Sequence, residues 1–149
     1  MGDYLLKVAA LLVVTNEAKY LPVFCTSLKE QNYSDIFLFV LDNNCKDNSI
    51  DIIRSYFPES NMLHVNENIG FAKGNNLYVE KAIADGSELL FILNLYIELE
   101  KNCISALVRL INKGKKIEAF APIMFFGNYD KKLNKIQSYA NRIDCKKES

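Results

Sequence analysis

Four short apolar runs in this chain each stop on residues whose side chains carry oxygen. Such oxygens accept hydrogen bonds from a base, a ribose or another small polar ligand. If the runs are strands of an open parallel sheet, all four stops lie along the edge where α/β folds bind ligands. The pattern predicts a small-molecule site, and a nucleotide fits it best. The runs are residues 8–14, 36–41, 62–65 and 89–93, and the stops are Thr15, Asn16 and Glu17; Asp42, Asn43 and Asn44; Asn66, Glu67 and Asn68; and Asn94.

The second stop, residues 42–49, combines a carboxylate with a tight turn. Asp42 at the end of a buried strand can accept a hydrogen bond from the N–H of a base or from a ribose hydroxyl. The alternative is that Asp42 only ends the strand, while Asp47 or Asn48 caps the next helix. The sequence leaves both readings open.

The third stop, residues 66–76, favours a phosphate group more specifically, with two glycines and four asparagines among eleven residues. Gly70 permits a positive φ at the start of a helix. The free N–H groups and positive dipole end of that helix suit a diphosphate, and Lys73 adds a positive charge. Gly74 would let the helix pack closely on another segment. The alternative is an ordinary capped helix whose asparagines face solvent.

Helical spacing separates the apolar runs and predicts the framework that positions these residues. Apolar residues recur at helical intervals over residues 21–28, 50–57, 71–83 and 104–111. A fifth strand is expected near residues 119–126, where Pro122 indicates an edge or a bulge. The alternation of strand and helix is that of a three-layer α/β/α fold with a doubly wound, mostly parallel sheet. We expect the domain to span residues 1–127 and a polar tail to span 128–149.

Composition narrows the class of partner. Eighteen Lys and Arg balance eighteen Asp and Glu, so no overall charge favours nucleic acid. Four scattered cysteines and one histidine, His64, do not form a zinc pattern. Reduced cysteines, no recognisable secretory signal and no run long enough to span a bilayer predict a cytoplasmic protein. An apolar edge at residues 119–126 would favour self-association.

The motifs in this order resemble family 2 glycosyltransferases with the GT-A fold, and the rhamnosyltransferase-like branch most of all. The matching pieces are residues 13–21, 42–49 and 66–76, together with Leu93 and Asn94, and the resemblance covers about residues 7–110. It implies a transferase of the hexosyltransferase type. Its donor would be a UDP- or dTDP-sugar, and inverting transfer would pass the sugar to a hydroxyl of a glycan, lipid or protein acceptor.

The resemblance also assigns roles to residues. Asp42, with Asn43 beside it, would contact the base, and the pocket for base and ribose would be lined by Thr15, Asn16 and Glu17. Asn68, Gly70, Lys73 and Asn75 would face the ribose or the diphosphate.

The metal corner departs from the family pattern. The family implies Mn²⁺ or Mg²⁺ held by an Asp-x-Asp or Asn-Pro-Asp motif, of which Asn94 keeps the first position. Tyr96 replaces the acid, and a neutral phenol is a poor ligand for a hard cation. Glu98 or Glu100 could substitute, although a solvated loop explains them more simply.

The chain leaves the catalytic residues unknown, because the family's acceptor site and general base would lie beyond Phe126, where no residue can be assigned. A second hypothesis is therefore a non-catalytic module derived from a glycosyltransferase, which binds a nucleotide or a partner. A sugar-phosphate nucleotidyltransferase or a dinucleotide dehydrogenase fits less well, because residues 15–18 are not the glycine-rich loop that either class requires.

Overall fold

The computed structural model describes residues 5–112, 124–125 and 136–138. By its internal contacts the chain divides into two units, Met1–Ser105 and Ala106–Ser149. Every predicted site residue belongs to the first unit. The predicted boundary after residue 127 lies outside the described residues and stays a prediction.

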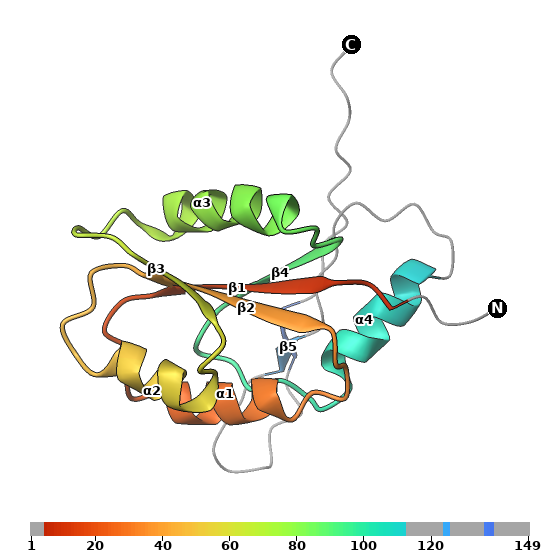
Figure 1. Cartoon of the computed structure of the whole chain (residues 1–149). Helices are drawn as coiled ribbons and strands as arrows, with labels where there is room; N and C mark the ends of the chain where they lie inside the picture. Colours follow the sequence, from red (N-terminus) through yellow and green to blue (C-terminus); the bar gives the residue numbers. More distant parts are fainter. Residues whose placement is uncertain (1–4, 113–123, 126–135, 139–149) are drawn as a thin grey trace. The chain divides into compact units, whose positions relative to one another are not determined.

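The first unit contains a four-stranded parallel sheet with the order β3-β2-β1-β4. Helix α3 covers one face of this sheet, and α1 and α2 lie on the other face (Figure 1). The predicted three-layer α/β/α architecture is confirmed. The elements are β1 (Val8–Val14), α1 (Leu21–Lys29), β2 (Ile36–Asp42), α2 (Ser49–Tyr56), β3 (Asn61–His64), α3 (Phe71–Ala84), β4 (Leu89–Leu93) and α4 (Cys103–Asn112).

The strand boundaries follow the apolar runs closely. β1 and β4 have the predicted bounds, β2 extends one residue further to include Asp42, and β3 begins and ends one residue earlier than expected. β1 is buried almost throughout, as expected of a strand with helices on both faces.

The predicted fifth strand differs from the expectation. Its described residues, β5 (Met124–Phe125), pair antiparallel with β6 (Ile136–Ser138) in a separate two-stranded sheet. β6 falls within the segment that the sequence predicts as a polar tail. The rest of residues 119–126, including Pro122 and most of the expected self-association edge, lies outside the described residues.

The core between the sheet and α3 shows how closely that helix packs on the sheet. Phe39 of β2 packs edge-on against Tyr78 of α3, with ring centroids 5.7 Å apart. The buried Tyr78 hydroxyl donates a 2.7 Å hydrogen bond to the backbone oxygen of Val40. One turn earlier, a Cβ on Gly74 would lie only 2.6 Å from Leu41 Cδ2, so the absence of a side chain lets α3 approach β2. The predicted close approach at Gly74 is confirmed.

Candidate nucleotide-binding site

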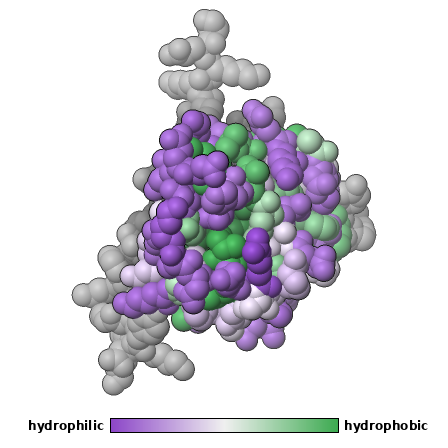
Figure 2. Space-filling view, turned by 60° about the vertical axis from the view of Figure 1, so that its left-hand side comes forward, coloured by the Kyte–Doolittle hydropathy of each residue, from purple (hydrophilic) through white to green (hydrophobic). Residues whose placement is uncertain are grey.

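The candidate site lies where the four parallel strands end. The loops after β1, β2, β3 and β4 come together at this edge, on the left of Figure 1. Figure 2 brings that side forward and shows a hydrophobic area bordered by hydrophilic residues. Val13, Val65 and Ile69 are partly buried apolar residues at these strand ends and loops. The edge therefore combines apolar surface with polar rims, as small-molecule sites commonly do.

The loop after β1 is held by the loop after β2. Asn16 has a positive φ of 51°, and its side-chain oxygen accepts hydrogen bonds from the backbone N–H groups of Lys46 and Asp47, at 2.6 and 3.2 Å. The backbone N–H of Glu17 donates to Ser49 Oγ at 2.9 Å. The side-chain oxygen of Asn16 thus positions the loop after β2, and the side-chain nitrogen takes no part in these two hydrogen bonds.

Of the two capping residues expected from the sequence, Asn48 holds the N-cap position of α2 but makes no side-chain capping hydrogen bond. The carboxylate of Asp47, one residue earlier, bonds to the first N–H of the helix instead. Its Oδ1 accepts a hydrogen bond from the N–H of Ser49 at 3.0 Å, and its Oδ2 accepts one from the N–H of Ala18 at 3.1 Å. The slight burial of the carboxylate raises its pKa, but these hydrogen bonds outweigh burial and hold the pKa of Asp47 below its usual value.

Asn43 joins three of the loops from a buried position. Its Nδ2 donates to Asn68 Oδ1 at 2.8 Å and to Thr15 Oγ1 at 3.2 Å. Its Oδ1 accepts a 2.9 Å hydrogen bond from the N–H of Ile69. The side chain is only 2% exposed, so its structural contacts hold the loops after β1, β2 and β3 together.

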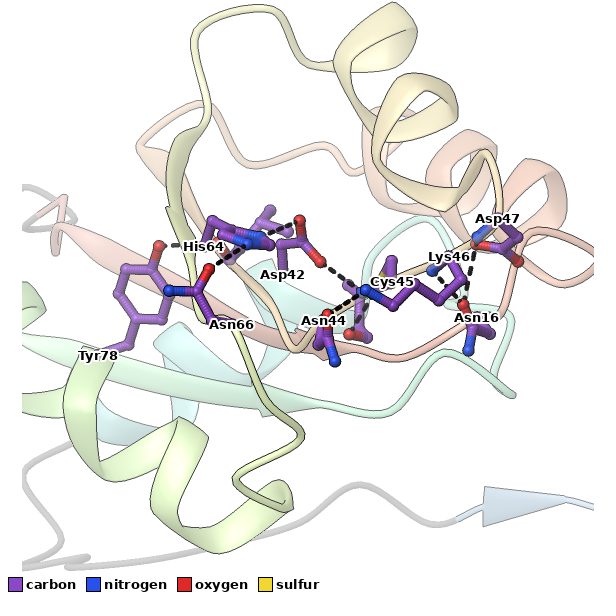
Figure 3. A network of polar contacts seen from close by, with 11 residues as sticks. Asn16, Asp42, Asn44, Cys45, Lys46, Asp47, His64, Asn66 and Tyr78 are labelled. Atoms are coloured by element: carbon purple, nitrogen blue, oxygen red, sulfur yellow. Dashed lines mark hydrogen bonds and ion pairs between the residues drawn. The ribbon is translucent and has the colours of Figure 1, made fainter.

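Asp42 lies at the last position of β2 beside His64, the last position of β3, because the two residues are partners in the parallel register. His64 Nδ1 and Asp42 Oδ2 are 2.7 Å apart, and His64 Nε2 lies 3.2 Å from Asn66 Oδ1. Figure 3 shows the His64 ring between Asp42 and Asn66. Asp42 Oδ1 accepts a 2.8 Å hydrogen bond from the N–H of Cys45.

These contacts set the charge of Asp42. Partial burial raises the pKa of the carboxyl group. The hydrogen bonds from Cys45 and His64 lower the pKa by more than burial raises it, so it lies below the ordinary value. Asp42 is therefore ionised at neutral pH and can accept hydrogen bonds from a ligand.

The beginning of α3 offers donors for an anion. Gly70 precedes the helix with a φ of +82°, and its N–H donates to Asn68 Oδ1 at 2.9 Å. Lys73 is exposed in the first turn. Asn75 differs from these residues because it is buried, its Nδ2 donates to the backbone oxygen of Phe71 at 2.9 Å, and its Oδ1 has no hydrogen-bond partner in the described part of the chain.

The corner after β4 is occupied by a tyrosine. Asn94 Oδ1 accepts a 3.1 Å hydrogen bond from the N–H of Tyr96, and the Tyr96 hydroxyl donates to Glu17 Oε1 at 3.1 Å. Glu17 Oε2 accepts a further bond from the N–H of Thr15 at 2.8 Å. The Tyr20 ring packs edge-on against Tyr96 at a centroid distance of 4.7 Å. The hydrogen bond to Glu17 and the charge of that carboxylate raise the pKa of Tyr96, which keeps the phenol neutral.

This corner does not fit a divalent metal ion. Across residues 5–112 and the two short described strands, no three His, Cys, Asp or Glu side chains lie where they could hold a metal together. A side-chain oxygen of Asn94 and one of Glu17 already accept hydrogen bonds from Tyr96. Tyr96 itself is a neutral phenol at the position where the family pattern has an acid that would bind the metal.

The structure brings most of the predicted site residues to one edge of the sheet. They come from the end of β2, from three adjoining loops and from the start of α3, and they are Thr15, Asn16, Glu17, Asp42, Asn43, Asn68, Gly70 and Lys73. Two contacts were not predicted from the sequence, the pairing of His64 with Asp42 and the bond between Tyr96 and Glu17. His64 lies near the predicted end of its strand, but only the register between β2 and β3 brings it to Asp42.

Three of the solved structures with a similar fold are of S. aureus TarS. S. aureus TarS shares 15% identity over 80% of this chain and 25% of its own, with a TM-score of 0.63. TarS 1–349 in complex with UDP has 15% identity, a TM-score of 0.63 and 41% of its own chain covered. TarS 1–349 in complex with UDP-GlcNAc has 16% identity, a TM-score of 0.62 and 40% covered. Each of the last two also matches over 80% of this chain. This chain thus spans less than half the length of these relatives.

These likenesses identify the fold as GT-A-like, the fold of nucleotide-diphospho-sugar transferases. The model of glycosyl transferase family 2 matches residues 10–148, and the chain therefore belongs to that family. A search of curated proteins finds none that matches this sequence. No helix in the described part of the chain is long and apolar enough to cross a membrane.

Proposed function

We propose that this chain binds a nucleotide-diphosphate sugar, with UDP or dTDP as the nucleotide, at the edge formed by the carboxyl ends of β1–β4. The observation that carries the proposal is the position of Asp42. Its ionised carboxylate ends a buried strand at the centre of interlocked loops, where a base N–H could reach it. The solved TarS complexes with UDP and UDP-GlcNAc share this fold and support the choice of nucleotide.

The remaining predicted residues take roles around Asp42. Thr15, Asn16 and Glu17 would border the base and ribose. Asn68, Gly70 and Lys73 would face the diphosphate, because the free N–H groups and dipole of α3 favour an anion there. The buried Asn43 would act by holding these loops in place, and Asn75 would act through the first turns of α3.

The reaction we propose is inverting transfer of the sugar to an acceptor hydroxyl. In such a reaction a general base removes the hydroxyl proton while the oxygen attacks the anomeric carbon and the nucleoside diphosphate leaves. The base and the acceptor site stay unassigned. Membership of the rhamnosyltransferase-like branch and a cytoplasmic location are further parts of this proposal.

A panel of nucleotides tests the proposal. A ligand that binds the folded state raises the melting temperature, so thermal unfolding is followed with UDP, dTDP, GDP and ADP, each with and without Mn²⁺. Selective stabilisation by UDP or dTDP in the wild type, lost in Asp42→Ala, is the expected result. An equal rise in melting temperature with all four nucleotides would contradict the proposal that Asp42 recognises the base.

The bond between Tyr96 and Glu17 favours a second candidate function, a module that binds a nucleotide or a partner without catalysis. It places a neutral phenol where the family motif supplies a metal ligand. Tyr96→Asp would restore the acid, and Tyr96→Phe removes only the hydroxyl. Mn²⁺-dependent binding of UDP by Tyr96→Asp alone would support this candidate, and Mn²⁺-stimulated binding by the wild type would contradict it.

A further inference from the structure

The carboxylate oxygen of Asp42 that a base would use already has a partner within the protein. Oδ1 accepts the N–H of Cys45, a bond within the turn that any ligand would leave intact. Oδ2 faces the imidazole of His64 at 2.7 Å. A base or ribose that donates a hydrogen bond to Oδ2 must therefore share this oxygen with His64 or displace the imidazole.

His64 is placed for displacement. Its side chain is 55% exposed, whereas that of Asp42 is 17% exposed. Its second ring nitrogen contacts Asn66, in the exposed loop directly after β3 (Figure 3). The imidazole can therefore swing away from Asp42 without opening the core.

We propose that His64 competes with the nucleotide base for Asp42, so that protonation of this histidine weakens donor binding. The inference rests on the proposed function, and it adds to that function a residue that makes affinity depend on pH. A charged imidazole is held to the carboxylate by an ion pair as well as a hydrogen bond. A neutral imidazole keeps the hydrogen bond alone and is displaced more easily.

The groups that face His64 give the sign of the effect. Asp42 from β2 is the charged group against it, and its pKa lies below the ordinary value, so it stays ionised throughout the range in which histidine titrates. From α3, Tyr78 approaches β3 through a hydroxyl bonded to the backbone oxygens of Val40 and Asn61, and burial raises its pKa, so it stays neutral. Donor affinity should therefore rise as pH increases through the range in which histidine side chains lose their proton.

The test measures binding of UDP-glucose to the 149-residue chain by calorimetry between about pH 5 and about pH 8, the range in which histidine changes charge. Both phosphates of this probe are esterified, so it lacks the second phosphate ionisation at about pH 6 that would confuse a titration with UDP. Wild type should bind about two- to fivefold more weakly at the acid end, the range of a partly exposed ion pair.

Two variants separate competition from other effects. His64→Gln can still donate a hydrogen bond but does not titrate, and its affinity should stay near the alkaline value of the wild type at every pH. Asn66→Ala removes the other partner of His64 while keeping Asp42, so its affinity should keep the pH dependence of the wild type. Melting temperatures of both variants confirm that each is folded.

The outcomes distinguish this inference from the proposed function. Wild-type affinity that is independent of pH, or weaker binding by His64→Gln at the alkaline end, would overturn the competition while leaving the nucleotide site in place. Absence of UDP-glucose binding by the wild type and by His64→Gln at every pH would refute the proposed function itself. Because the chain has one histidine, its NMR ring signals also report displacement directly, and signals unchanged by saturating UDP-glucose would contradict it.

Discussion

Replacing the buried Asn43 by alanine should both destabilise the protein and disorganise the candidate site. The side chain makes three hydrogen bonds, of 2.8, 2.9 and 3.2 Å, that join the loops after β1, β2 and β3. At a net 0.5–1.5 kcal/mol each, they contribute about 1.5–4.5 kcal/mol. Water can reach the exposed Asn68 once the amide is gone, so we expect a loss of about 2–3 kcal/mol.

Urea unfolding followed by circular dichroism measures this loss, with the transition midpoint and slope fitted together. Asn48→Ala is the matched control, because Asn48 lies exposed in the same loop and its side chain makes no capping hydrogen bond. That control should change the free energy of unfolding by less than about 0.5 kcal/mol.

Binding provides the second readout. Asn43 is too buried to contact the nucleotide directly. Asn43→Ala should nevertheless weaken UDP binding, because Thr15, Asn68 and Ile69 lose their common hydrogen-bond partner. A free energy of unfolding within about 0.5 kcal/mol of the wild type would refute the idea that Asn43 organises these loops.

Three further predictions follow from the contacts around the site. Gly74→Ala should destabilise the protein in urea by about 1–2 kcal/mol, because overpacking against Leu41 outweighs the better helix propensity of alanine. Asn76→Ala, which is exposed on α3, should not destabilise it, and equal effects of the two would exclude overpacking. Because the pKa of Asp42 is lowered in the folded state, its stabilising contribution is full above the unfolded pKa of about 3.9 and is lost as pH falls through the lower folded value. Below about pH 4, the free energy of unfolding of Asp42→Asn should therefore depend less on pH than that of the wild type. Identical pH profiles of the two proteins would show that Asp42 does not contribute to the loss of stability in acid. Burial raises the pKa of Cys25 to about 11, so mass spectrometry should find Cys25 unmodified by iodoacetamide in the folded protein and modified in urea. Modification of Cys25 under native conditions would contradict its burial.

The sequence was sufficient for the framework of the first unit because its strands and helices are strongly patterned. Both runs lie between a charged residue and a polar one, Lys7 and Thr15 for β1 and Glu88 and Asn94 for β4, so their bounds could be predicted to the residue. Gly74 was also informative, since a glycine inside a helix pattern indicates a close approach.

The pairing of side chains at the site could not be predicted in the same way. His64 lies on a four-residue strand, and its contact with Asp42 depends on the register between β2 and β3, which a shift of one residue would change. Asn43 reads as a polar turn residue like its neighbours, and only its burial in the folded chain shows that its contacts are structural. Tyr96 could be recognised as a departure from the family motif, but its bond to Glu17 joins residues 79 positions apart.

The proposed function depends on the binding of a uridine or thymidine diphosphate group through Asp42. Calorimetric titration of UDP and dTDP into the wild type and into Asp42→Ala, at a pH near 8 where histidine is neutral, tests it most directly. We expect saturable binding of at least one of the two nucleotides by the wild type. The affinity should be at least about tenfold weaker in Asp42→Ala, because the ligand loses a hydrogen bond to a charged group. Binding of neither nucleotide by the wild type, or equal affinity in Asp42→Ala, would contradict it.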